Sequence, residues 1–426
     1  MKILVIGGGG REHAIIKKLS ESKKISAIYA APGNGGIGNI AACTGISAGD
    51  FDGIVSFSIS NAIDLVVVAP DNPLVDGLVD LLNSKGISAW GPDKKAAIIE
   101  GSKGFSKVLM KKHGIPTAKY EIFSNEDEAK EYIIKNNCYP IVIKADGLAL
   151  GKGVIIANSE SEALAAVNSI MSEKVFGESG SEIVVEEFLT GTEVTVLSFT
   201  DGKTIVPMIS SMDHKRAKDG DLGLNTGGMG VIAPSPLYTK EIADVCMRDI
   251  FIPTVRAMRE DGRAFKGCLY FGLMLTRDGP KVIEYNCRFG DPEAQAVLPL
   301  LKTDLLEIFE AIIDERLDKI NVEFEDSHSC CVIIASGGYP EKYSTGYPVS
   351  GLDKVDDDVF VYHSGTKIEN GECLTSGGRV LCVQAKADSL EKAVSNAYGS
   401  AEKISFTDSF YRKDIGDKAL KAIGGI

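Results

Sequence analysis

The sequence predicts a multidomain protein in which a parallel α/β domain is followed by a larger α+β region and a small C-terminal α+β domain. The chain has 426 residues, which is too many for one ordinary hydrophobic core. Apolar runs alternate with amphipathic stretches in the first hundred residues, whereas many later runs are joined directly by short turns. We therefore place the domains at residues 1–103, 104–327 and 328–426.

The N-terminal domain is expected to form a parallel sheet covered by helices. Apolar runs at 2–6, 25–31 and 64–69 are short and bounded by Gly or Pro, which favours buried strands. The amphipathic stretches at 11–22 and 73–86 have the periodicity of helices. Strands that alternate with helices are typical of a parallel α/β sheet.

The middle region is expected to be built mainly on antiparallel sheets. The stretch 269–287 is predicted to be a hairpin that turns about Asp278-Gly279. The C-terminal region begins with an apolar run near residue 328 and ends in a strand–helix unit at 379–404. Further strands are predicted at 141–145, 154–157, 183–188, 193–200 and 204–211, and helices at 159–171, 239–261 and 303–313.

Composition and charge limit the partners and the compartment. The net charge of −13 argues against a nucleic acid or an anionic membrane as partner. The nine cysteines lack metal-binding spacing, because Cys330 and Cys331 are adjacent and no CxxC occurs, so reduced thiols in the cytoplasm are expected. The sequence shows neither a signal peptide nor a long apolar span, and we expect a cytoplasmic protein without a membrane partner.

A glycine-rich turn, "VIGGGGREHA" (5–14), lies between the first predicted strand and the first helix. Glycine lets a ligand approach the backbone closely, and the amides at a helix N-terminus attract anions. The dinucleotide pattern G-x-G-x-x-G fails, because the third glycine position counted from Gly7 is Glu12. A phosphate site at residues 9–11 and a tight turn without a ligand are the two alternatives.

The stretch "KADGLALGKGVII" (144–156) combines a strand end, a glycine loop with a cation and a returning strand. Glycines let such a loop close over phosphates, and Lys152 supplies a mobile positive charge; a solvated hairpin tip is the alternative. Lys144 ends an apolar Ile-Val-Ile run, so its stem is buried and its ammonium needs an anionic partner. Lys103 is a third candidate for a phosphate contact, or else a solvated helix lysine.

Two carboxylates, Glu186 and Glu187, end the apolar run in the stretch 183–193. Backbone that is exposed after a strand can accept from and donate to an adenine ring. Glu193 is then spaced to accept hydrogen bonds from ribose hydroxyls. Acidic strand ends are usually only solvated, and that is the alternative here.

The most specific pattern is "KVIEYNCRFGDPEAQ" (281–295). Glu284 and Asn286 are two apart on a predicted strand and therefore face the same side. Hard oxygen ligands, completed by phosphate oxygens, are how Mg²⁺ is commonly held. Arg288 is two residues beyond Asn286, so in an extended chain its side chain would face the same side as Glu284 and Asn286. Its planar guanidinium suits a carboxylate or a phosphate. A polar sheet face with a salt bridge is the alternative.

The long loop 212–230 lacks apolar periodicity and is expected to be functional or mobile.

Together these segments resemble one family from end to end: phosphoribosylamine–glycine ligase, also called glycinamide ribonucleotide synthetase, of the ATP-grasp superfamily. The resemblance implies a Rossmann-like N-terminal domain, an ATP-grasp domain with a mobile lid at about 120–190, and a small C-terminal domain. It also implies that ATP phosphorylates the carboxylate of glycine and that 5-phosphoribosylamine attacks the glycyl phosphate. The resemblance rests on "GGREHA", "APGN", "EGSK", "IVIKADGLALGKGVI", "VVEEFLTGTE", "DHKR", "NTGGMG", "KVIEYNCRFGDPEAQ", "SGGYP", "GGRVLCV" and "YRKDIG".

The same resemblance implies roles for the candidate residues. Lys144, Arg288 and Asp213 are the implied catalytic residues, with Arg288 at the carboxylate of glycine and Asp213 at its ammonium. Glu284 and Asn286 are the implied ligands of Mg²⁺ or Mn²⁺. The implied ATP contacts are Lys103, Lys144 and Lys152 at the phosphates, Glu186, Glu187 and Leu189 at adenine, and Glu193 at the ribose. The implied phosphoribosylamine contacts are Gly9, Gly10, Pro32, Gly33, Asn34, Asn225, Thr226 and Gly227.

Three positions, Gly8, Asp71 and Leu224, depart from the pattern of that family, and other functions stay open. Asp71 stands where Glu is more familiar, and the strand 269–275 supplies no further carboxylate for a metal. An NAD-dependent oxidoreductase would use the glycine turn but leave the Glu-Asn pair and the lysine loop without a role. A nucleotide sensor would bind ATP without turnover, and a related ligase would use another carboxylate. We expect a monomer that acts on small molecules.

Overall fold

The N-terminal sheet is parallel, as predicted. The computed structural model describes residues 1–149 and 153–424, and its first five strands pair in parallel in the order β3-β2-β1-β4-β5. The strands are β1 (Lys2–Gly7), β2 (Ala27–Pro32), β3 (Ala42–Cys43), β4 (Leu65–Val68) and β5 (Ala89–Trp90). The helices that follow them include α1 (Gly10–Leu19), α2 (Phe51–Ser60), α5 (Lys94–Gly101) and α6 (Lys103–His113).

The single helix predicted at 73–86 is wrong. The structure has two helices there, α3 (Asp71–Asp76) and α4 (Leu78–Ser84). Gly77 separates them with a φ of 95°, a left-handed conformation that ends a helix and that glycine adopts without a steric penalty. Periodicity detected the apolar face of the stretch but not the break within it.

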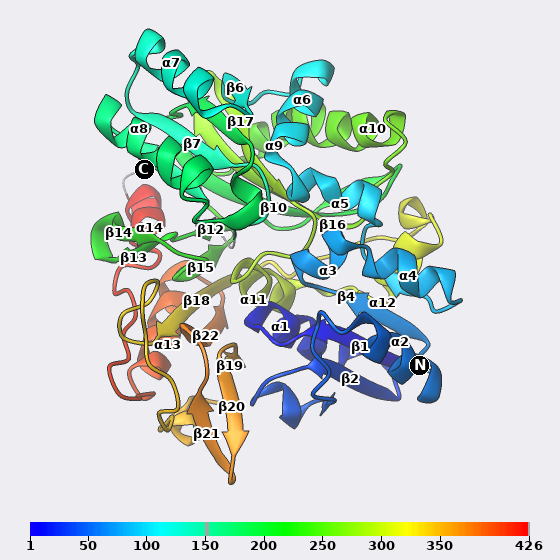
Figure 1. Cartoon of the computed structure of the whole chain (residues 1–426). Helices are drawn as coiled ribbons and strands as arrows, with labels where there is room; N and C mark the ends of the chain where they lie inside the picture. The colour runs from blue at the N-terminus through cyan, green and yellow to red at the C-terminus, as the bar shows by residue number, and fades with distance from the viewer. Residues whose placement is uncertain (150–152, 425–426) are drawn as a thin grey trace.

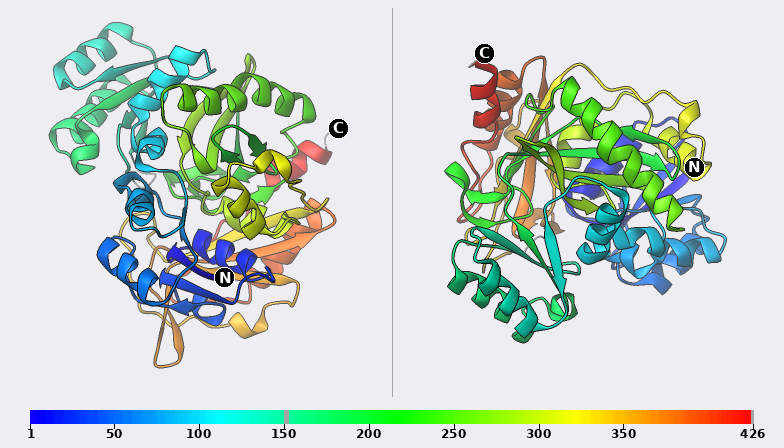
Figure 2. Two further views of the ribbon diagram at one scale, coloured as in Figure 1. Left: turned by 90° about the vertical axis from the view of Figure 1, so that its right-hand side faces the viewer. Right: turned by 90° about the horizontal axis from the view of Figure 1, so that it is seen from above.

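A four-stranded antiparallel sheet with two helices forms the lid, defined here as residues 120–187. Its strands pair in the order β6-β9-β7-β8. Its hydrophobic core contains only lid residues, among them Ile133 and Ile143, and the lid stands out from the rest of the chain in the left view of Figure 2. The elements are β6 (Tyr120–Phe123), α7 (Glu126–Asn136), β7 (Ile141–Ala145), β8 (Val154–Ala157), α8 (Glu160–Val167) and β9 (Ile183–Glu187).

The central sheet is antiparallel, with strand order β11-β10-β16-β17. The hairpin predicted at 269–287 is present as β16 and β17, whereas the strand predicted at 204–211 is limited to Ile205–Pro207. Helix α12 packs on one face, and α9 and α10 supply the core on the other. The elements are β10 (Thr192–Asp201), β11 (Ile205–Pro207), α9 (Lys240–Cys246), α10 (Ile252–Glu260), β16 (Lys266–Thr276), β17 (Gly279–Asn286) and α12 (Leu305–Ile313).

The C-terminal sheet includes two strands from the middle of the chain. Its order is β12-β15-β18-β22-β19, and every pair is antiparallel. The domain boundary placed at residue 328 therefore falls between β15 and β18, two strands that pair in this sheet. The elements are β12 (Met212–Asp213), β13 (Arg216–Lys218), β14 (Leu222–Asn225), β15 (Gly230–Ala233), α11 (Glu293–Val297), β18 (His328–Ala335), β19 (Val359–His363), β20 (Thr366–Glu369), β21 (Glu372–Thr375), β22 (Arg379–Ala387), α13 (Leu390–Ala401) and α14 (Asp417–Gly424).

Hydrophobic cores join the N-terminal, central and C-terminal sheets. One core contains Val5 of β1, Phe309 of α12 and Ile333 of β18. In Figure 1 the blue N-terminal sheet and the orange C-terminal sheet accordingly lie below the central sheet, on the side away from the lid. Within residues 1–149 and 153–424, no helix combines the length and the apolar character needed to cross a bilayer.

Candidate active site

One face of the central sheet carries the predicted metal ligands and the predicted ribose contact. The strand ladders place Thr195 of β10 and Glu284 of β17 on either side of Gly272 of β16. Glu193 and Asn286 are each two residues away along their strands and therefore point to the same face. A Cβ atom at Gly272 would lie 3.0 Å from Cγ of Glu284, so the missing side chain makes room for this carboxylate.

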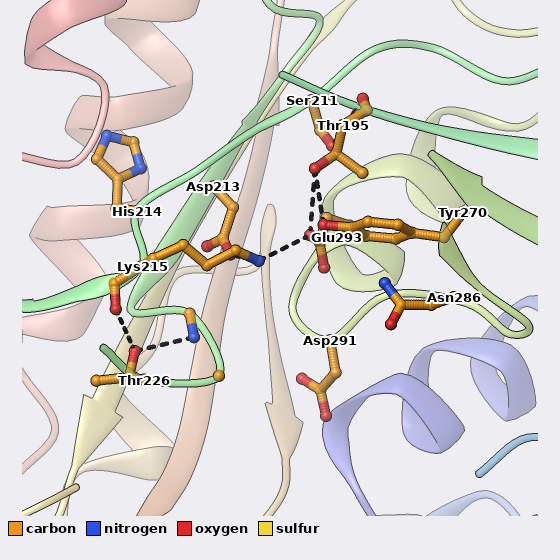
Figure 3. A network of polar contacts seen from close by, with 12 residues as sticks. Thr195, Ser211, Asp213, His214, Lys215, Thr226, Tyr270, Asn286, Asp291 and Glu293 are labelled. Carbon is orange, nitrogen blue, oxygen red and sulfur yellow. Dashed lines mark hydrogen bonds and ion pairs between the residues drawn. The ribbon is translucent and has the colours of Figure 1, made fainter. Parts of the chain in front are cut away.

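A half-buried lysine and two buried carboxylates form a charge network beside this face (Figure 3). Lys215 Nζ lies 2.6 Å from Asp213 Oδ2 and 3.7 Å from Glu293 Oε1. Thr195 Oγ1 lies 3.0 Å from Tyr270 Oη and donates to Glu293 Oε1 at 3.5 Å. Burial disfavours the charge of Lys215, but Asp213, Tyr270 and Glu293 outweigh it and raise the pKa of Lys215 well above its usual value. A permanently charged ammonium is therefore fixed at this site.

Glu193 lies within the field of several other carboxylates. Burial is the main cause that raises the pKa of Glu193 to about 7. The charge of Lys215 opposes the shift, whereas Glu284, Asp213 and Glu293 add to it. This excess of negative charge favours a cation or a neutral hydrogen-bonding group as the ligand of the site.

Lys144 has the anionic partner that its buried position requires. Its side chain is almost fully buried, and Nζ lies 2.9 Å from Glu186 Oε1 and donates to Ile283 O at 3.0 Å. Lys107 donates to Glu186 Oε2 at 2.8 Å. The carboxylate of Glu186 is therefore a buried bridge between two lysines, and the backbone of this residue is the part left for the predicted adenine contact.

Lys103 lies near Lys144 and Glu284, as expected of a second phosphate contact. Its Nζ donates to Gly147 O at 2.8 Å, in the loop that follows β7. Burial lowers the pKa of Lys103; the carboxylate of Glu284 opposes this effect, and the charge of Lys144 adds to it. Lys152, the other lysine predicted at the phosphates, lies outside the described residues.

The predicted adenine segment lies where the chain leaves the lid. Glu187 Oε1 accepts from Lys119 N at 2.9 Å and lies 3.6 Å from Lys281 Nζ. The amide of Glu187 in turn donates to Lys119 O at 2.9 Å. The chain then leaves β9 through the partly exposed Phe188 and Leu189. The adenine contact of this segment stays a prediction.

Arg288 is held by carboxylates that come from the N-terminal side of the molecule. Its Nη2 donates to Glu100 Oε1 at 2.8 Å and lies 3.7 Å from Asp71 Oδ2. The same nitrogen donates to Asn286 Oδ1 at 3.2 Å. Arg288 Nε is buried and has no hydrogen-bond partner among residues 1–149 and 153–424. The Nε–H of Arg288 is therefore available for the predicted carboxylate contact, which stays a prediction.

The N-terminal glycine turn is shaped by close packing. A Cβ atom at Gly10 would lie 2.3 Å from Gln295 Nε2, and one at Gly33 would lie 2.4 Å from Cys43 Sγ. The amide of Gly9 donates to the carboxylate of its own helix at Glu12. Gly10 thus brings the turn against Gln295 of α11, and Gly33 brings it against Cys43 of β3. The amide of Gly9 is already satisfied by Glu12.

Asn34 holds the N-terminal turn to the C-terminal sheet. Its Nδ2 donates to Gly8 O at 2.8 Å and to His363 O at 2.7 Å. Its Oδ1 accepts from the amides of Gly36 and Ile37, both at 2.9 Å. An asparagine side chain has two donors and two acceptor positions, and all four are used. The side chain of Asn34 therefore positions the turn, and its role in enclosing the substrate stays a prediction.

Arg379 of β22 joins the loop 225–228 to the turn that follows β17. Its Nη1 donates to Gly227 O at 2.8 Å and to Asp291 O at 2.7 Å. Its Nη2 lies 3.3 Å from Asp291 Oδ2. A Cβ atom at Gly227 would lie 2.9 Å from Cζ of Arg379, so this glycine allows the close approach. The loop with the predicted substrate residues is thus fixed from the C-terminal sheet.

The structure brings most of the predicted residues to the junction of these segments, and it adds others. Thr226, which stands between Asn225 and Gly227 in the chain, lies beside Lys215, whose carbonyl accepts from Thr226 Oγ1 at 2.8 Å (Figure 3). Pro32 ends β2 next to the glycine turn. Lys215 lies within "DHKR" and Glu293 within "KVIEYNCRFGDPEAQ". Both motifs were singled out in the sequence, so these two residues could have been predicted from it. The residues that sequence reasoning did not assign are Glu100, Lys107, Lys215, Glu293 and Arg379.

Comparison with known proteins decides the family. Models of the N domain, the ATP-grasp (A) domain and the C domain of phosphoribosylglycinamide synthetase match residues 1–100, 101–294 and 329–418. A phosphoribosylamine–glycine ligase of Caldanaerobacter subterraneus subsp. tengcongensis is 48% identical over 415 residues, which cover 97% of this chain and 99% of the relative. The chain belongs to the phosphoribosylglycinamide synthetase family. The multidomain α/β and α+β architecture predicted for that family is confirmed.

Solved structures agree with membership in the phosphoribosylglycinamide synthetase family. The crystal structure of phosphoribosylamine–glycine ligase from Thermotoga maritima matches with a TM-score of 0.82 at 30% identity, covering 97% of this chain and 100% of the other. The biotin carboxylase domain of Hydrogenobacter thermophilus 2-oxoglutarate carboxylase matches with a TM-score of 0.74 at 18% identity, covering 96% and 91%, which shows a shared fold. Enzymes of the ATP-grasp fold use ATP and a divalent metal ion.

Proposed function

We propose that this chain joins glycine to 5-phosphoribosylamine at the expense of ATP, giving glycinamide ribonucleotide, ADP and phosphate. The observation that carries the proposal is the 48% identity, over 97% of the chain, to a phosphoribosylamine–glycine ligase. The site has matching chemistry, since buried lysines adjoin a Glu-Asn pair, and a separate network of Lys215, Asp213 and Glu293 lies beside them.

In the first step, a carboxylate oxygen of glycine attacks the γ-phosphorus of ATP, and the bond to ADP breaks. Two anions must approach one another, so fixed cations lower the barrier. Lys103 and Lys144 supply this charge from α6 and β7 in the proposed arrangement. Arg288 Nε would hold the carboxylate of glycine, and Asp213 its ammonium.

In the second step, the amine of phosphoribosylamine attacks the carbonyl carbon of glycyl phosphate. A C–N bond forms, the bond to the phosphate oxygen breaks, and the amine loses a proton. The loop 225–228, held by Arg379, is positioned to enclose the amine substrate. Water must be excluded while the acyl phosphate exists, and the lid is suited to cover it.

The donor set of the predicted metal ligands fits a hard divalent cation. Glu284 offers a carboxylate and Asn286 an amide oxygen, which are ligands that Mg²⁺ prefers. Within residues 1–149 and 153–424 there is no cluster of three or more His, Cys, Asp or Glu side chains that could hold a metal alone, so phosphate oxygens or water would complete the shell. When bound, the cation would screen the charge of the phosphates. Mg²⁺ or Mn²⁺ as the ion, a cytoplasmic location and a monomeric state stay predictions.

Release of ADP tests the proposal directly. The chain is incubated with ATP, Mg²⁺ and glycine, with and without phosphoribosylamine generated in the cuvette. Turnover is expected only when glycine and the amine are both present, and it is expected to fail with alanine in place of glycine. Turnover without the amine, or equal turnover with alanine, would refute the substrate pair. Removing divalent metal with a chelator is expected to abolish ADP release, and adding back Mg²⁺ or Mn²⁺ separately shows which ion restores it.

A further inference from the structure

Glu186 is a buried carboxylate that two lysines share. Its exposed fraction is 4%, and those of Lys107 and Lys144 are 2% and 3%. Lys144 belongs to the lid, on β7, whereas Lys107 belongs to α6, outside the lid. A buried charge that loses its partner is strongly destabilising. The contacts of one lysine with Glu186 therefore affect how freely the other can leave.

The two lysines hold Glu186 in different ways. Lys107 Nζ donates to Oε2 and to Thr117 Oγ1, both at 2.8 Å, and Thr117 donates to Val282 O at 2.7 Å. Lys144 Nζ lies 2.9 Å from the other carboxylate oxygen, Oε1, and donates to Ile283 O at 3.0 Å. Lys107 is thus held by Thr117 as well as by Glu186, whereas Lys144 is held by Glu186 and by the carbonyl of Ile283, which lies outside the lid.

We infer that Lys107 is a positioning residue that keeps Glu186 paired while Lys144 turns to the phosphates of the nucleotide. The inference rests on the proposed function, in which Lys144 contacts ATP. With Lys107 in place, Glu186 retains a cation when Lys144 leaves Oε1. Without Lys107, Lys144 would be the one cation paired with Glu186 among the residues that the structure describes, and the carboxylate would compete with the phosphates for this ammonium.

Lys107→Met tests this role, because it keeps an apolar stem of similar length and removes the charge. The dissociation constant of a non-hydrolysable ATP analogue with Mg²⁺ is expected to rise about tenfold or more, since a buried charge pair loses one partner. In the ligation assay the KM for ATP is expected to rise by a similar factor, with the KM for glycine unchanged. The control is Lys111→Met, which removes an exposed lysine one turn further along α6 and is expected to leave both constants unchanged.

A second substitution separates this role from simple stabilisation. Glu186→Gln in the Lys107→Met background removes the competing carboxylate charge and is expected to restore most of the affinity for the analogue. Tm is measured for each variant. A lower Tm with unchanged analogue affinity in Lys107→Met would overturn the inference, and so would a double variant that binds no better than Lys107→Met. If the unaltered chain does not bind the analogue, the proposed function fails and the inference fails with it.

Discussion

The lid and the C-terminal sheet both adjoin the central sheet, but they are attached to it in opposite ways. The lid, residues 120–187, has a core of its own residues and contacts its surroundings through ion pairs such as Lys107–Glu186 and Lys281–Glu187. The C-terminal sheet takes β12 and β15 from the middle of the chain. It also shares a hydrophobic core with the N-terminal domain.

This difference separates a part that can move from a part that cannot. A unit with its own core can rotate without exposing apolar surface, and polar contacts at its border can be exchanged for contacts with water or a ligand. A unit that completes a shared sheet can move only by breaking ladder hydrogen bonds. The lid is therefore suited to open and close over the nucleotide, and the C-terminal sheet is suited to hold the loop 225–228 still.

The largest effect is expected where the lid supplies charge to the reaction. Lys144→Ala removes a buried ammonium from β7, and ADP formation is expected to fall about a hundredfold to a thousandfold, as when a preorganised electrostatic contact is lost. Lys130→Ala is the matched control, because it removes a lid lysine that pairs with Glu126 on the surface of α7. Near-normal ADP formation in Lys144→Ala would contradict the phosphate assignment.

Two core substitutions test whether the lid is a separate unit. Ile133→Ala in the lid core and Ile333→Ala in the shared core each remove a buried isoleucine, and each is expected to cost about 3 kcal/mol locally. Hydrogen exchange is expected to increase only within residues 120–187 for Ile133→Ala. For Ile333→Ala it is expected to increase in the N-terminal and C-terminal sheets together. Faster exchange in the N-terminal sheet of Ile133→Ala would show that the cores are coupled.

A pair of glycines tests how rigidly the C-terminal sheet holds the loop 225–228. A Cβ atom at Gly228 would lie 2.5 Å from Pro292 Cδ and 2.7 Å from Asp213 Oδ1, whereas nothing lies within 4 Å of one at Gly220. Both glycines have positive φ, 116° and 68°, so both substitutions carry a backbone cost of about 1–2 kcal/mol. Gly228→Ala is expected to lower kcat/KM for the amine about tenfold with the KM for ATP unchanged, because only this site is crowded. Equal kinetics in the two variants would contradict this.

The smallest effect is expected near the C-terminus of the chain, beyond the C-terminal sheet. Asp414 accepts two hydrogen bonds there from Arg412, both at 2.8 Å. Burial opposes the charge of Asp414, but the hydrogen bonds from Arg412 and Gly220 lower its pKa from 3.8 to about 2. Because the pKa is lower in the folded state, this stabilisation is complete above about pH 5 and is lost as the pH falls toward 2.

Urea unfolding of Asp414→Asn tests that window. The deficit in unfolding free energy relative to the unaltered chain is expected to be constant from pH 7 to 5 and to shrink between about pH 4 and 2. Asp353→Asn, at an exposed surface position, is the control and is expected to show no such dependence. A deficit for Asp414→Asn that does not change with pH would show that the carboxylate charge is not the source of the stability.

Local patterns were sufficient for much of the fold and part of the site. The hairpin of β16 and β17 follows from its apolar runs and its glycine turn. The shared face of Glu284 and Asn286 follows from strand parity alone, because side chains alternate along a strand. The buried stem of Lys144 likewise follows from the Ile-Val-Ile run before it. Each of these features depends on residues that are close in the sequence.

The features that were missed depend on contacts between distant residues. Lys107 and Glu186 come from different elements, and neither sequence neighbourhood indicates the other. All hydrogen-bonding groups of Asn34 are used, partly by His363, so its role could not be read from the turn that contains it. The pairing of β15 with β18 is equally non-local. Periodicity describes which face of an element is apolar, but it does not specify which distant element covers that face.

The position of β15 also has a consequence for synthesis on the ribosome. Ile232 pairs with Cys330, and translating the segment between them takes about 5–20 s at ordinary rates. Until β18 emerges, β15 presents an open strand edge of the kind that promotes aggregation and attracts chaperones. A nascent chain stalled after Asn286 and before β18 would contain the predicted metal and nucleotide residues, but its loop 225–228 would lack Arg379, the arginine that holds it. Catalytic competence is therefore acquired only when the last strands are made.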